Sequence, residues 1–146
     1  MRRGRHRVVD RSGVVAALAA LALVGCSRSP RDQAKKALES LHSWAVSTQM
    51  VGERWVEGAV PDSYASKALQ SFGKKMEKER GKIASGELPA DTKRLLIAGF
   101  DSTARATDSL LSIVDKREKS AAVDILKQLS ARARAADAFE ARLGAT

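Results

Sequence analysis

Few side chains in this 146-residue sequence have the types and spacing of a reactive site. Glu39-Ser40-Leu41-His42 is the Glu-x-x-His element that di-iron helical bundles use twice. It occurs once here, and His42 is the only histidine after residue 25. His42 with Met50 and Met76 has the ligand types of a copper site, but both methionines are better explained by core packing. The sequence therefore predicts no metal site.

Candidate hydrolytic groups are equally scarce. No G-x-S-x-G turn is present, and a Ser-His-Asp triad would have to use His42. Glu53 and Glu57 lie one helical turn apart, but with Arg54 beside them they are typical of a solvated helix face rather than of a catalytic carboxylate pair. The glycines are isolated or at helix ends, so no loop could hold a phosphate group. We therefore expect a protein that is not an enzyme.

The most informative residue is Cys26, the only cysteine in the chain. It follows an apolar run at positions 14–24, and arginines at positions 2, 3, 5, 7 and 11 precede that run. A basic segment before a short apolar run is typical of a secretory signal, and the run is too short to span a membrane as a helix. Arg2-Arg3 lacks the apolar residues that follow a twin-arginine pair. Leu23, Val24, Gly25 and Cys26 together resemble the lipobox of bacterial lipoproteins.

This resemblance implies that residues 1–25 are a cleaved signal peptide and that Cys26 begins the mature chain. Cys26 would carry a covalent diacylglyceryl group and an N-acyl chain such as palmitate, which suffices for stable anchoring, and no other cofactor is expected. The alternative is an ordinary cleavage site beside a chance cysteine. Because Ser27 rather than Asp follows, we expect the outer membrane, facing the periplasm, in a diderm bacterium. In a monoderm bacterium the anchor would hold the protein on the outer face of the plasma membrane.

Residues 26–146 contain 21 Lys and Arg against 16 Asp and Glu, so almost half of the net charge of +9 precedes Cys26. The high pI is therefore largely a property of the export signal, and we expect no nucleic-acid partner. The remaining surplus suggests an anionic lipid, an anionic polymer or an envelope protein as partner. The basic residues nearest the anchor, which we expect to contact the membrane, are Arg28, Arg31, Lys35 and Lys36.

Hydrophobic residues after Cys26 repeat at helical spacing in four segments. Ser29 is the expected N-cap of the first helix, with Pro30 at its first position. Breaks containing Gly and Pro at 58–61 and 86–89 separate the first three helices. The expected helices span about residues 30–57, 61–85, 90–114 and 117–143.

The end of the third helix is the least defined, because residues 115–120 contain neither Gly nor Pro. One alternative is a tight turn in which Asp115 and Glu118 form a pair like a capping box. The other is one uninterrupted helix of about fifty residues, which is unusual for an ordinary domain. We favour the turn.

Four helices of similar length with short connections predict an all-α domain at residues 30–146, an antiparallel up-down-up-down four-helix bundle. Residues 26–29 are too few for a flexible tether, so the bundle would stand directly on its membrane. An even number of helices returns the C-terminus to the membrane end. The turns near residues 58–61 and 115–120 would lie at the far end.

The leading hypothesis for function is a lipid-anchored envelope protein that acts as a non-enzymatic interaction partner or accessory subunit. It is motivated by the anchor, the rigid bundle and the absence of reactive groups. The alternative is a periplasmic bundle that binds a small ligand or a metal, with Trp44 and Trp55 lining an apolar cavity.

Overall fold

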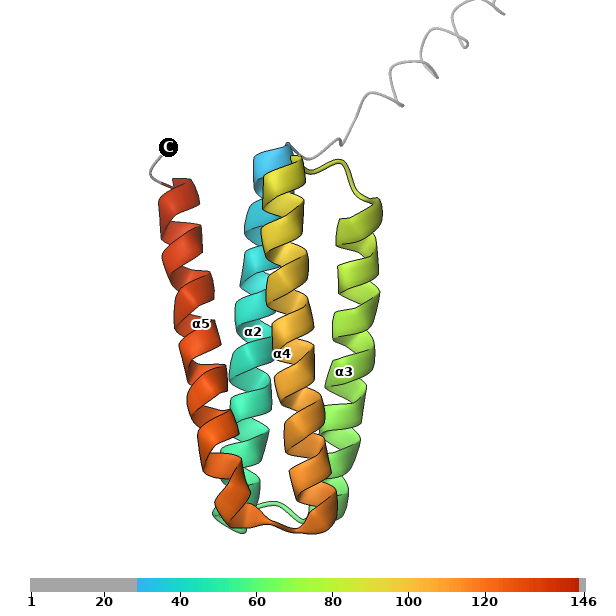
Figure 1. Cartoon of the computed structure of the whole chain (residues 1–146), viewed down its shortest axis with the longest axis vertical. Helices are drawn as coiled ribbons and strands as arrows, with labels where there is room; N and C mark the ends of the chain where they lie inside the picture. The colour runs from blue at the N-terminus through green and yellow to red at the C-terminus, as the bar shows by residue number, and fades with distance from the viewer. Residues whose placement is uncertain (1–28, 145–146) are drawn as a thin grey trace, which may run out of the picture.

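The computed structural model describes residues 29–144, so the expected signal peptide, the lipobox-like residues and Cys26 lie outside the described part. The helices are α2 at Pro30–Val56, α3 at Asp62–Ser85, α4 at Ala90–Lys116 and α5 at Ala122–Gly144, with a 3₁₀ helix, η1, at Lys119–Ala121. They run alternately up and down, and no strand occurs within 29–144 (Figure 1). The expected all-α antiparallel four-helix bundle is confirmed. None of these helices has a stretch apolar and long enough to cross a membrane.

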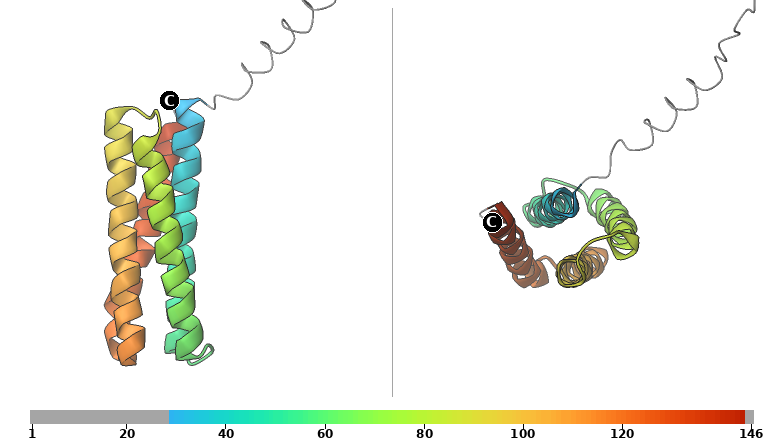
Figure 2. Two further views of the ribbon diagram at one scale, coloured as in Figure 1. Left: turned by 90° about the vertical axis from the view of Figure 1, so that its right-hand side faces the viewer. Right: turned by 90° about the horizontal axis from the view of Figure 1, so that it is seen from above.

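The four helices form a four-sided array when viewed along the bundle axis (Figure 2). The most extensive packing joins α2 to α5 and α3 to α4. Helices α2 and α4 also contact each other across the diagonal, whereas α3 and α5 do not approach one another. The centre of the core is therefore built mainly by α2 and α4.

The two ends of the bundle are distinct. The start of α2, the loop between α3 and α4 and the end of α5 lie at one end, here called the proximal end (Figure 1). The turns at 57–61 and 117–121 lie at the opposite, distal end. Ser29 caps α2 as expected, since its Oγ accepts a hydrogen bond from the Asp32 N–H at 3.1 Å.

Helix α4 ends before residue 117, so the turn is the correct alternative and the fifty-residue helix is wrong. Arg117 adopts a left-handed conformation with φ 60°, and the Glu118 N–H donates to the Ile113 carbonyl at 3.0 Å, which completes a Schellman motif. The expected capping pair does not form. Glu118 makes no side-chain cap, and Asp115 accepts a hydrogen bond from Ser66 Oγ at 2.7 Å instead. Because η1 follows this turn, α5 begins five residues later than expected.

The core has a proximal part around Leu96 and Phe100 and a distal part around Trp55 and Leu110. The buried polar residues between the two parts are Thr48, Thr103 and Thr107. Close packing in the distal part depends on Gly52, where a Cβ would lie 2.6 Å from Leu126 Cδ2 and 2.8 Å from Leu110 Cδ2. The bundle is therefore tightly packed at its distal end and contains polar groups at its middle.

Candidate functional site

The basic residues expected near the membrane lie on the first two turns of α2, at the proximal end. Arg31, Lys35 and Lys36 are exposed there, whereas Arg28 is outside the described residues. Lys35 Nζ lies 3.9 Å from Glu39 Oε1 and 3.8 Å from Glu140 Oε1 on α5, so two carboxylates partly balance its charge. Lys36 faces a different neighbour, α3.

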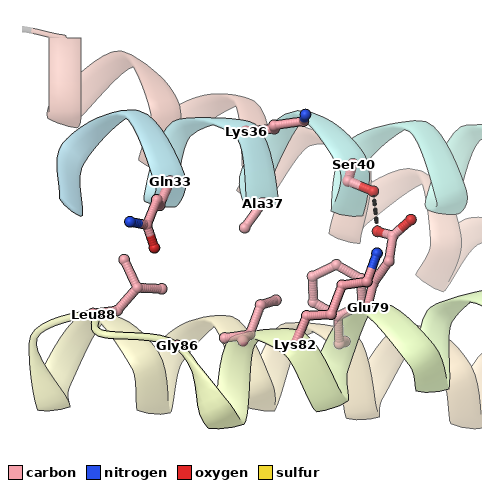
Figure 3. A pocket seen from close by; sticks show the side chains of 10 residues that line it. Gln33, Lys36, Ala37, Ser40, Glu79, Lys82, Gly86 and Leu88 are labelled. Carbon is pink, nitrogen blue, oxygen red and sulfur yellow. Dashed lines mark hydrogen bonds between the residues drawn. The ribbon is translucent and has the colours of Figure 1, made fainter. Parts of the chain in front are cut away.

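A groove of about 710 Å³ lies between α2 and α3 at the proximal end, lined in part by apolar side chains (Figure 3). Lys36 of α2 and Lys82 of α3 are its basic residues. Deeper along the helices, Ser40 Oγ donates a hydrogen bond to the Glu79 carboxylate and joins α2 to α3 (Figure 3). The fold thus places a second basic helix beside the residues predicted from α2.

The basic residues of α3 were not among the predicted contacts. Exposed lysines in the second half of this helix are Lys74, Lys75, Lys78 and Lys82. They lie in the proximal half because α3 runs from the distal to the proximal end. Arg80 differs from them, since its guanidinium donates hydrogen bonds to the Asp101 carboxylate on α4, which raises the pKa of Arg80. Sequence alone shows the lysine cluster but not the end of the molecule to which it belongs.

A second cavity, of about 240 Å³, lies between α2, α4 and α5 in the proximal half and is here called the α5 cavity. Most of its lining is apolar, and the two polar side chains that line it are Thr103 and Arg132. Thr103 Oγ1 is buried and has no hydrogen-bond partner in the part of the chain that the structure describes. Arg132 Nε donates to Ser102 Oγ at 2.8 Å.

Neither tryptophan lines the α5 cavity. Trp55 is completely buried in the distal core, where its Nε1 donates to Asp62 Oδ1 at 2.8 Å. Trp44 is half-buried and packs against Phe72 of α3, with ring centroids 5.5 Å apart. The two tryptophans therefore have separate structural surroundings rather than a shared ligand site.

The residues considered for metal binding do not come together. His42 Nε2 lies 3.5 Å from Asp137 Oδ1 on α5, an ion pair that requires a protonated histidine. Met76 is completely buried, but Met50 is 56% exposed, so the core position expected for Met50 is wrong. Within residues 29–144, no group of three or more His, Cys, Asp or Glu side chains could hold a metal ion.

The paired carboxylates considered for hydrolysis are both exposed. Gln49 Nε2 donates to Glu53 Oε1 at 2.7 Å, and Arg54 Nη1 lies 3.5 Å from Glu57 Oε2. Each carboxylate is thus held by a neighbour on its own segment and faces solvent.

Large apolar side chains are exposed unevenly over the bundle. The exposed ones are Val46, Met50, Tyr64, Leu95 and Val123. Among residues 29–142, Leu95 is the one that lies in the proximal half, next to the α5 cavity, and the other four lie in the distal half. The two halves of the surface therefore differ: lysines are concentrated in the proximal half and exposed apolar groups in the distal half.

Comparisons with family models, with curated proteins and with solved structures find no match to this chain. Its function is therefore inferred from the placement of its own residues.

Proposed function

We propose that this protein is a lipid-anchored, non-enzymatic subunit of a bacterial cell envelope that binds another envelope component through the distal half of its bundle. The observation that carries the proposal is the difference between the two halves of the surface. Both lysines of α2 and four of the five lysines of α3 lie in the half of the bundle that follows Cys26, and four of the five exposed large apolar side chains among residues 29–142 lie in the opposite half. We place the membrane at the first half and the partner at the second.

The proposed anchor rests on the lipobox-like residues that end at Cys26. The proposed position of the bundle rests on the short segment between Cys26 and α2. Only residues 27–29 separate Cys26 from the first residue of the helix. A lipid on Cys26 would therefore hold the proximal end within reach of the headgroups. Each lysine near an anionic surface contributes about 1 kcal/mol, so Lys36 and Lys82 would add to the hydrophobic anchor and orient the bundle.

The partner surface follows from exposed apolar groups that the bundle itself does not bury. Met50 and Tyr64 are each 56% exposed, and Val46 and Val123 are 41% and 45% exposed. Burial of apolar surface contributes about 25 cal/mol per Å², so a partner that covers these side chains gains binding free energy from them. A protein surface is the partner that fits this chemistry.

The anchor is tested by expressing the full chain in a bacterium that is fed an alkyne-labelled fatty acid. The wild-type protein should carry the label and sediment with membranes, and the Cys26→Ala variant should lose both properties. Ser27→Ala is the matched control, because it leaves the cysteine and the lipobox intact. Labelled, membrane-bound Cys26→Ala protein would show that the anchor is elsewhere.

The partner surface is tested by placing a photo-crosslinking amino acid at Met50, Tyr64 or Lys82 of the full chain in living cells. One protein should be captured from positions 50 and 64, and lipid should be captured from position 82. Capture of that protein from position 82 alone would contradict the proposed orientation. Turnover of an envelope substrate that is lost on changing one polar residue would contradict the non-enzymatic role.

A further inference from the structure

The α5 cavity combines a mainly apolar wall with one threonine and one arginine. Its walls are formed by apolar side chains of α2, α4 and α5, and Ala135 and Ala136 leave space because their side chains are small. An apolar cavity of about 150 Å³ is large enough to hold a molecule the size of benzene, and this cavity of about 240 Å³ is larger.

The polar groups of the cavity lie at one end of it. Thr103 of α4 and Arg132 of α5 lie toward the middle of the bundle, whereas Leu95 and Phe139 lie toward the proximal end. Leu95 is 57% exposed, so an exposed apolar side chain lies at the proximal end of the cavity. The cavity is thus polar at its inner end and apolar along the rest of its length.

Thr103 supplies an independent indication of a ligand. Its hydroxyl is buried, with 1% of the residue exposed, and it makes no hydrogen bond within residues 29–144. Buried hydroxyl groups are almost always hydrogen-bonded, so Thr103, a residue of the cavity wall, carries a hydroxyl that lacks a partner among the described residues. Arg132 donates to Ser102 and to Gln128, and its second terminal nitrogen, Nη2, has no bond to any described residue. A hydroxyl donor and a guanidinium donor together suit a carboxylate.

We propose that the α5 cavity binds one fatty acid, with its carboxylate between Thr103 and Arg132 and its alkyl chain along α4 toward Leu95. Leu95 and Thr103 are two helical turns apart, about 12 Å, which is the length of an extended chain of about ten carbons. Longer chains would leave the cavity past Leu95. This site uses no residue of the anchor and does not depend on the lipid at Cys26.

The first test is a chain-length series on the purified full-length protein in nanodiscs, with a photoactivatable decanoate as probe. Adducts should map to α4 between Leu95 and Thr103 and to α5 between Arg132 and Phe139. Unlabelled fatty acids should compete about fourfold better for each added methylene up to about ten carbons and then level off. An affinity that keeps rising with chain length, or adducts spread over all four helices, would indicate partition into the membrane and overturn the proposal.

The second test separates the carboxylate contact from the apolar contact. Arg132→Gln should weaken competition by decanoate about tenfold or more, as expected for a charged hydrogen bond, and leave competition by decanol unchanged. Ala135→Phe fills the cavity from an exposed position, so it should abolish competition by both compounds without unfolding the bundle. Arg134→Gln, an exposed arginine on the same helix that does not line the cavity, is the matched control. Equal effects of Arg132→Gln and Arg134→Gln would overturn the assigned carboxylate site.

Discussion

Two threonines of α4, one helical turn apart, are equally buried but differently hydrogen-bonded. Thr107 Oγ1 donates to the Thr103 carbonyl at 3.0 Å and lies 3.3 Å from the Thr48 hydroxyl. Thr103 Oγ1 makes no such bond to a described residue. A buried polar group without a hydrogen bond calls for an explanation, and a ligand contact is one that fits Thr103.

Replacing each threonine by the isosteric valine should therefore have opposite effects. Thr103→Val removes an unsatisfied hydroxyl and should raise the free energy of unfolding by about 1 kcal/mol. Thr107→Val leaves the Thr48 hydroxyl without its partner and should lower the free energy of unfolding by about the same amount. Urea denaturation of the two variants measures both changes. Destabilisation by Thr103→Val would mean that its hydroxyl has a partner in the apo protein.

Arg117 has a left-handed backbone conformation, which is unfavourable for any residue other than glycine. An L-residue in the left-handed region is destabilised by about 1–2 kcal/mol, whereas glycine is not. Arg117 Nε also lies 3.0 Å from Asp62 Oδ2, but the arginine side chain is 79% exposed and such surface pairs contribute little. Gly58, at φ 78°, holds the corresponding position at the end of α2.

We expect Arg117→Gly to be more stable than Arg117→Ala by about 1 kcal/mol, because both lose the ion pair and only alanine keeps the unfavourable conformation. Thermal melts of the two variants are the measurement. Comparing them with each other removes the contribution of the ion pair. Equal melting temperatures would show that residue 117 is not left-handed in solution.

At the scale of the helix, glycine has opposite consequences in α2 and α3. Gly52 of α2 is buried where Leu110 of α4 and Leu126 of α5 leave no room for a Cβ. Gly81 of α3 is exposed, and no atom lies within 4 Å of where its Cβ would be. The packing of α2 therefore requires glycine at position 52, whereas the packing of α3 does not require glycine at position 81.

Gly81→Ala should stabilise the protein by about 1 kcal/mol through helix propensity alone. Gly52→Ala should destabilise it despite the same gain, because overpacking in a closely packed core costs about 1–3 kcal/mol. The denaturation midpoint should be highest for Gly81→Ala, intermediate for the wild type and lowest for Gly52→Ala. A stabilising Gly52→Ala would show that Leu110 and Leu126 can move aside easily.

At the scale of the whole molecule, the antiparallel topology distributes charge unevenly. Helix α3 carries four of its five lysines in its second half, and the fold brings that half beside the start of α2. Lys36 and Lys82 line one groove, whereas Lys67 and Lys116 lie in the distal half. An anchored bundle would present these two sets of lysines to different surroundings.

This orientation is tested by labelling the lysines of the protein, purified from bacterial cells and incorporated into lipid vesicles. With anionic lipid present, Lys36 and Lys82 should be protected from a water-soluble acylating reagent, and Lys67 and Lys116 should react freely. Zwitterionic vesicles are the control, since the electrostatic part of the protection should weaken without anionic lipid. Uniform reactivity at all four lysines would show that the bundle does not rest on its proximal end.

Local signals in the sequence predicted the four helices and their order along the chain. The helical spacing of apolar residues, the Ser29-Pro30 start and the breaks at 58–61 and 86–89 each depend on neighbours within a few positions, so they predict helices and turns directly. They also determined the lipobox-like segment, whose residues are adjacent in the chain. The mechanism of the turn after α4 could not be predicted, because a left-handed arginine has no sequence pattern.

The candidate sites depend on contacts between helices, which only the tertiary structure decided. The α5 cavity joins Thr103 to Arg132 from different helices, and the basic groove joins Lys36 to Lys82. Met50 lies off the buried stripe of α2 that contains Leu41 and Trp55, and its apolar type alone did not place it in the core. Spacing along one helix fixes which residues share a face, but the facing helices determine which face is buried and where space remains.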